Sequence, residues 1–109
     1  MIDEKYLRSS AKKRRLNFSS HAIQRMIERD IDVAHVYKTV QYGKIPEIQN
    51  FPEFKDIHVV FQELTPDFPA YYVIVAHSVP QPTVVTVCLT LSEVWEWADG
   101  FLKRKGRYK

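Results

Sequence analysis

The sequence has little cysteine, little glycine and no long apolar run, and each shortage argues against a class of protein. With Cys88 as its single cysteine, the chain cannot form an internal disulfide, which agrees with a reducing compartment. Its three glycines form no Gly-rich phosphate loop and no Gly-x-Ser-x-Gly elbow, so nucleotide-dependent and serine-hydrolase functions lose support. No run of about 18 apolar residues would span a bilayer, and the N-terminus lacks the apolar segment of a signal peptide. We therefore expect a soluble, cytoplasmic protein with no membrane partner.

Metal-binding patterns are missing as well. The four histidines show no His-x-His or His-Glu-x-x-His spacing, and a lone cysteine cannot form Cys-x-x-Cys. These histidines are His21, His35, His58 and His77. We expect neither a metal ion nor another cofactor.

What the chain does have is positive charge at both ends. Residues 1–15 carry six Lys/Arg against two acids, residues 101–109 carry five and no acid, and residues 16–100 carry five against eleven. Basic ends on an acidic body favour a polyanion such as RNA as partner, although simple solubility explains them equally well. The candidate nucleic-acid-binding residues are Lys12, Lys13, Arg14, Arg15, Lys103, Arg104 and Lys105.

The N-terminal half has the period of helices. Residues 3–15 fit either a short helix or a mobile basic arm, and residues 16–18 fit a brief strand. A helix should begin after Ser19 or Ser20, since either hydroxyl can cap its first amides. The apolar residues expected to form its buried stripe are Ile23, Met26 and Ile27.

A second helix should follow a turn at Asp30, which tolerates a left-handed backbone, with Asp32 as its N-cap. Gly43 should end that helix. Its apolar positions, spaced i, i+3, i+4 and i+7, are Val33, Val36, Tyr37 and Val40.

From residue 44 the period changes to that of strands, and we expect a three-stranded antiparallel meander with one or two strands added. The predicted strands cover residues 45–48, 57–64, 71–76 and 83–91. A final helix should begin at Ser92, with Trp95 and Trp97 packed against the sheet rather than serving as base-stacking platforms. Residues 103–109 read as a basic tail.

Together these elements predict one α+β domain. It would consist of a basic arm (1–15), a core of two helices packed on a small sheet of three to five antiparallel strands (16–91), and a C-terminal helix with a basic tail (92–109).

Several short motifs resemble the domain of unknown function family 4258, over about residues 16–90. They are His21-Ala22-x-x-Arg25-Met26-x-x-Arg29-x-Ile31, then Val36, Gly43-Lys44-Ile45, Tyr72-Val73-Ile74-Val75 and Val84-Val85-Thr86-Val87. Asp30 departs from the pattern, because relatives often have glycine there. That family is usually placed near the RelE, ParE and BrnT toxins, so the resemblance implies a RelE-like arrangement of the helices and sheet.

The same resemblance implies a chemistry, since some members of the wider superfamily are metal-independent ribonucleases in which an RNA 2′-hydroxyl attacks the adjacent phosphate. In this chain His21 would transfer the proton, and Arg25 and Arg29 would bind the phosphate. Tyr72 and Thr86 are further candidates, as hydroxyl groups from the sheet.

Purely structural roles for these side chains are equally open. His21 would then bond sheet backbone, and the two arginines would pair with Glu28, Asp32 or Glu63.

Two functions of other classes remain as alternatives. One is a non-catalytic nucleic-acid-binding module that uses the basic ends. The other is a protein-interaction domain bound by an antitoxin or an immunity protein, for which an exposed apolar patch would be the sign.

Overall fold

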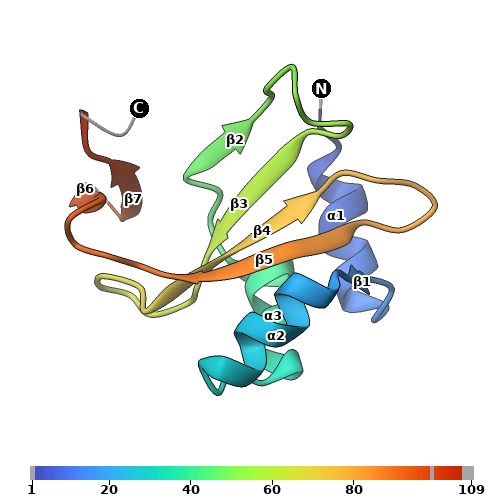
Figure 1. Cartoon of the computed structure of the whole chain (residues 1–109), viewed down its shortest axis with the longest axis horizontal. Coiled ribbons are helices and arrows are strands. Elements are labelled where there is room, and N and C mark those ends of the chain that lie inside the picture. The colour runs from blue at the N-terminus through green and yellow to red at the C-terminus, as the bar shows by residue number, and fades with distance from the viewer. Residues whose placement is uncertain (1, 99, 107–109) are drawn as a thin grey trace.

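The computed structural model describes residues 2–98 and 100–106. The described residues form three helices, all in the N-terminal half of the chain, together with a five-stranded sheet and a separate two-stranded hairpin (Figure 1). The elements are α1 (Glu4–Lys12), β1 (Asn17–Phe18), α2 (Ser20–Glu28), α3 (Val33–Tyr42), β2 (Glu47–Gln49), β3 (His58–Gln62), β4 (Tyr71–Ala76), β5 (Thr83–Leu89), β6 (Trp95–Ala98) and β7 (Phe101–Arg104). None of the described helices is long and apolar enough to cross a membrane.

Each helix begins at a side-chain cap. The carboxylate of Asp3 accepts a hydrogen bond from the Tyr6 amide, Ser19 Oγ accepts from the Ala22 amide, and Asp32 accepts from the Ala34 amide. The last two caps confirm the starts expected for α2 and α3. The turn between those helices is also as expected, because Asp30 has a left-handed backbone with φ 53°.

Of the two alternatives for the N-terminal segment, a helix is the one observed. Leu7 and Ala11 are buried in the core, where α1 packs against α3. The Arg8 guanidinium adds hydrogen bonds to the carbonyls of Val40 and Gln41 at the end of α3. Leu7 and Ala11 lie one turn apart on the same face of α1, and Ile2 and Tyr6 also pack against the core, so a few apolar contacts order a strongly basic segment.

The sheet has the strand order β1-β5-β4-β3-β2. Strands β3, β4 and β5 form the expected antiparallel meander, but β1 pairs with β5 in parallel, so the sheet is mixed and the prediction of a purely antiparallel sheet was wrong. Ser19 extends this contact: its amide donates to the Val84 carbonyl and its hydroxyl donates to the Val85 carbonyl. A two-residue strand carries no sequence signal for the direction in which it pairs.

The three helices cover one face of the sheet and enclose the core with it. The buried residues of this core are Leu7, Ala11, Leu16, Ala22, Met26, Val36, Val40, Val59, Phe61, Val73, Val75, Val84 and Val87. For α2 the predicted stripe was wrong in part, because Ala22 and Met26 face β5 while Ile23 and Ile27 are exposed. The small side chain of Ala22 allows the helix to approach the strand closely, and this rotation turns the two isoleucines away from the core.

The C-terminal segment forms the hairpin β6–β7, which packs against part of the other face of the sheet, so the prediction of a C-terminal helix was wrong. Trp95 and Leu102 are buried there, and Gly100 has a left-handed φ of 84° at the turn. Gln62 from β3 binds the hairpin backbone twice, donating to the Gly100 carbonyl and accepting from the Leu102 amide, both at 3.0 Å. The helical spacing of apolar residues is a local signal. Burial of the second sheet face depends on tertiary contacts, and a flat hairpin can pack against that face.

The two tryptophans differ in their surroundings. The ring of Trp95 contacts that of Tyr72 on β4 edge-to-face at 5.1 Å, which confirms packing against the sheet. Trp97 is half-buried and borders a cleft. The expected basic tail is partly wrong as well, because Lys103 and Arg104 belong to β7; residues 107–109 lie outside the described residues.

Candidate functional site

The cationic side of α2 carries His21, Arg25 and Arg29, spaced one turn apart. Arg25 donates to Glu28 at 2.8 Å, and this hydrogen bond is the main cause that lowers the pKa of Glu28. Arg29 Nη1 lies 3.4 Å from the carbonyl oxygen of Val87 on β5. His21 is exposed and forms no hydrogen bond with any described residue.

These contacts match the structural alternative only in part. Arg25 does form the predicted ion pair, but Arg29 binds sheet backbone instead of a carboxylate. Asp32 is used as a helix cap, and Glu63 accepts hydrogen bonds from the amides of Thr65 and Ala70 in its own loop. The imidazole of His21 and the half-exposed guanidinium of Arg25 therefore remain accessible on α2.

Tyr72 and Thr86 lie on the sheet face that the hairpin covers, away from α2. Their strand neighbours Val73 and Val87 point into the helical core, so alternation sends Tyr72 and Thr86 to the opposite face. Burial, and then the neighbouring Cys88 thiol, raises the pKa of Tyr72 to about 12. The structure therefore separates these two hydroxyls from the α2 cations. The alternation of side chains along each strand is the sequence signal that could have predicted this separation.

Four consecutive cations, Lys12 to Arg15, form what we call the basic corner. All four are exposed, and none forms an ion pair within the described part of the chain. The corner is ordered by Arg14, whose backbone is left-handed (φ 59°) and whose guanidinium lies 4.7 Å from the centre of the Tyr37 ring on α3. Tyr37 in turn contacts Phe18 of β1 edge-to-face.

The basic corner therefore lies at the end of the molecule where α2 begins (Figure 1). The C-terminal cations lie on the hairpin at the opposite end of the view. Sequence reasoning grouped the two sets as one kind of arm, but the fold separates them.

Arg104 has a structural role that the sequence did not signal. Its guanidinium forms two hydrogen bonds with the Glu47 carboxylate, both at 3.0 Å, and lies 4.3 Å from the centre of the Trp95 ring. Burial opposes ionisation of Glu47, but hydrogen bonds from Arg104 and Gln49 outweigh it and lower the pKa of Glu47. Lys103 is exposed and Lys105 half-buried.

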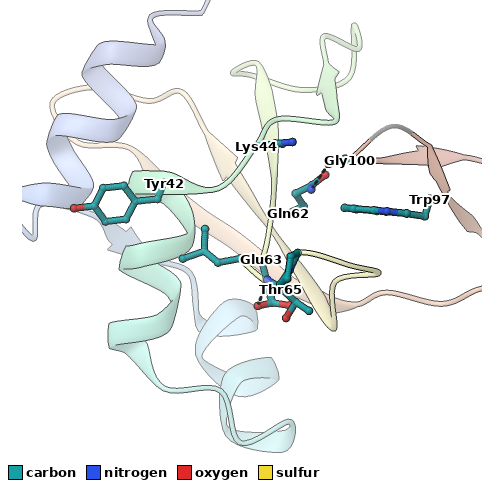
Figure 2. A pocket seen from close by; sticks show the side chains of 9 residues that line it. Tyr42, Lys44, Gln62, Glu63, Thr65, Trp97 and Gly100 are labelled. Carbon is teal, nitrogen blue, oxygen red and sulfur yellow. Dashed lines mark hydrogen bonds between the residues drawn. The ribbon is translucent and has the colours of Figure 1, made fainter.

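A small cleft of about 160 Å³ lies between the hairpin and the end of β3 (Figure 2). Its lining residues are Tyr42, Lys44, Gln62, Glu63, Leu64, Thr65, Pro66, Trp97 and Gly100. The Trp97 ring borders the cleft beside Gln62 and Gly100, and the Lys44 ammonium lies 4.8 Å from the centre of the Phe101 ring. Sequence reasoning predicted a role for Trp97 but gave Lys44 only as part of the motif Gly43-Lys44-Ile45, since a single lysine in a loop carries no signal for a site. A base-stacking role for Trp97 was the alternative to packing, and its position leaves both open.

No three His, Cys, Asp or Glu side chains of the described residues come close enough to hold a metal ion. The fold thus defines a small α+β domain in which helices cover one face of a mixed sheet, a hairpin packs against part of the other face, and cations gather at one corner. A family model described as a domain of unknown function, DUF4258, matches residues 18–88, and the chain belongs to that family. Searches of curated proteins and of solved structures found no match. The basic corner and the hairpin lie outside the matched range.

Proposed function

We propose that this domain binds RNA through the basic corner and the adjoining start of α2. The observation that carries the proposal is the run of four exposed cations, Lys12 to Arg15, at a fixed end of α1. Because α1 is packed against α3 and Arg14 is stacked on Tyr37, these charges are held in place before a ligand arrives. Binding then requires less ordering of the protein than a mobile arm would.

The strength of this interaction follows from counterion release. Each phosphate of a single strand that a cation neutralises contributes about 0.7 to the slope of log K against log salt concentration. Replacing three of the corner cations should therefore lower that slope by about 2. Lys12, Lys13 and Arg15 are the suitable positions, because Arg14 also packs on Tyr37.

The test compares the wild-type protein with a Lys12→Gln, Lys13→Gln, Arg15→Gln variant. A matched control, Lys5→Gln, Lys38→Gln, Lys55→Gln, removes the same charge from exposed positions elsewhere. Fluorescence anisotropy with a single-stranded RNA of about 12 nucleotides would give the affinity between about 50 and 200 mM salt. We expect the corner variant alone to lose affinity and slope. Equal behaviour of both variants would refute the proposal.

A second candidate function is metal-independent RNA cleavage. It is favoured by the positions of His21 and Arg25, which lie one turn apart on the same side of α2. The order of helices before strands, which resembles that of the RelE, ParE and BrnT toxins, supports it. His21 would take the proton of a 2′-hydroxyl while the 2′-oxygen bonds to phosphorus, with Arg25 balancing the added charge. The bond between phosphorus and the 5′-oxygen breaks, that oxygen takes a proton from water, and the products are a 2′,3′-cyclic phosphate and a 5′-hydroxyl. Tyr72 and Thr86 take no part, because they lie on the other face of the sheet.

Incubation with total RNA in EDTA tests this second candidate. Because His21 is exposed, His21→Ala should keep the melting temperature of the wild-type protein, so a loss of cleavage would report chemistry. Arg25→Ala should also lose activity, whereas Gln24→Ala on the same helix should not. Retention of RNA without cleavage in the wild-type protein would leave RNA binding alone.

A further inference from the structure

A groove on the outer side of α2, continuing into the turn before α3, is the feature that neither the core nor the cationic side explains. It encloses about 380 Å³. Its lining residues are Ile23, Met26, Ile27, Asp30, Ile31 and Asp32. Ile23 is 47% exposed and Ile27 is 75% exposed, although their spacing is that of a buried stripe.

Scattered exposed apolar residues are common on proteins, but two isoleucines one turn apart beside an apolar groove form a contiguous patch. Val33, at the start of α3, is also exposed (45%) and follows the groove residues in the chain. The described residues leave three quarters of Ile27 exposed. The pattern is typical of a surface that another chain completes.

The groove is independent of the cations on α2. With 100° per residue, Ile23 and Ile27 project from one flank of the helix, and His21 and Arg25 project from roughly the opposite flank. A ligand in the groove therefore leaves the cationic side uncovered.

We propose that this groove binds a short amphipathic helix of a partner protein, with apolar side chains against Ile23 and Ile27 and a lysine or arginine against Asp30 and Asp32. Charge complementarity carries the choice of partner, since both charged residues that line the groove are acidic and neither forms an ion pair within the described residues. One carboxylate oxygen of Asp32 accepts a hydrogen bond from the Ala34 amide, and the carboxylate keeps its negative charge.

The size of the groove agrees with a helical segment rather than a second copy of this chain. From Ile23 to the end of α2 at Glu28 the helix rises about 7.5 Å, which is about one and a half turns. A stable dimer usually buries about 800 Å² on each partner, far more than so short a stretch of helix supplies. Helix-in-groove recognition needs only a few apolar anchors spaced i, i+3 or i+4.

The probe is a synthetic helical peptide of about 14 residues with leucines at i, i+3, i+4 and i+7 and lysines at one end of that face. A second peptide has glutamate in place of lysine. Binding is measured by calorimetry, together with sedimentation of the free protein. We expect the lysine peptide to bind better than the glutamate peptide, and Ile27→Gln to weaken its binding by about tenfold.

Two further variants sharpen the outcome. Asp30→Asn, which suits the same left-handed backbone, should reduce the preference for lysine, since Asp32 keeps its charge. Leu91→Gln changes another exposed apolar residue (52% exposed) after β5, outside the groove, and should leave peptide binding unchanged. Equal binding of both peptides, equal loss in the Leu91 variant, or a dimer that Ile27→Gln dissociates would overturn the proposal. Because Ile27 is exposed, its substitution should not unfold the protein.

Discussion

Replacing Gln62 with leucine should loosen the C-terminal hairpin from the sheet. The Gln62 amide is buried (4% exposed) and is the donor to Gly100 and the acceptor from Leu102. A leucine of similar size would leave the Leu102 amide without its acceptor in a buried place, which costs about 1–3 kcal/mol. The lost bond to Gly100 adds to this, and the apolar leucine side chain offsets part of it.

We take a net loss of about 2 kcal/mol as the working value, which corresponds to a factor of about 30 in the equilibrium between docked and undocked hairpin. Hydrogen exchange of the amides in β6 and β7 should accelerate by that factor, while exchange in β4 should change much less, since the helical core is untouched. Trp95, which is 1% exposed, should become accessible to acrylamide in a Trp97→Phe background.

The control is Gln24→Leu, a glutamine-to-leucine change at an exposed position of α2. It should leave hairpin exchange unchanged. If exchange in β6 and β7 were the same in the wild-type protein and in Gln62→Leu, the two hydrogen bonds of Gln62 would not hold the hairpin, and the reasoning would be refuted.

Three other substitutions test separate contacts. Because the pKa of Glu47 is lowered in the folded protein, its pairing with Arg104 stabilises the fold above the unfolded-state pKa of about 4.3, and this stabilisation is lost as pH falls through the lower folded pKa. In Glu47→Gln, the free energy of unfolding measured with urea should therefore depend less on pH between about pH 6 and 3. Gly43→Ala should destabilise by about 1–3 kcal/mol in thermal melts, because the new Cβ would collide with the carbonyl oxygens of Gln62 and Thr39, and Gly106→Ala, with open space, is its control. Ser19→Ala should cost at least about 1 kcal/mol, since it removes the α2 cap and a bond to β5, whereas Ser20→Ala should cost less.

The local parts of this fold follow from short-range chemistry and could be predicted. Ser19 and Asp32 cap the two helices because their short side chains reach the free amides of the first turn, and Asp30 accepts the left-handed turn for the same kind of local reason. Strand β4 was predicted at its observed bounds because a continuous apolar run suits a central strand. The ion pair of Arg25 with Glu28 was likewise an expectation from spacing alone.

For the candidate site, sequence alone supplied the residue types and the α2 spacing but not their grouping. Lys12 to Arg15 were predicted as cations, yet only packing of α1 on α3 places them on a rigid corner beside α2. Tyr72 and Thr86 were proposed with His21 from their positions in the predicted strands, and strand parity sends them to the other face. Arg104 was predicted as a nucleic-acid-binding cation, but in the fold it forms an ion pair with Glu47.

Tertiary structure decided which residues each element buries where two sets of residues fit the local pattern equally well. On α2 both Ala22 with Met26 and Ile23 with Ile27 satisfy helical period, and the close approach to β5 selects the pair with the smaller side chain. At the C-terminus the same residues fit a helix by spacing and a hairpin by alternation, and the open face of the sheet selects the hairpin. Sequence determines local geometry because those contacts span a few residues. The choice of partner belongs to the fold, because that free energy exists only when distant segments meet.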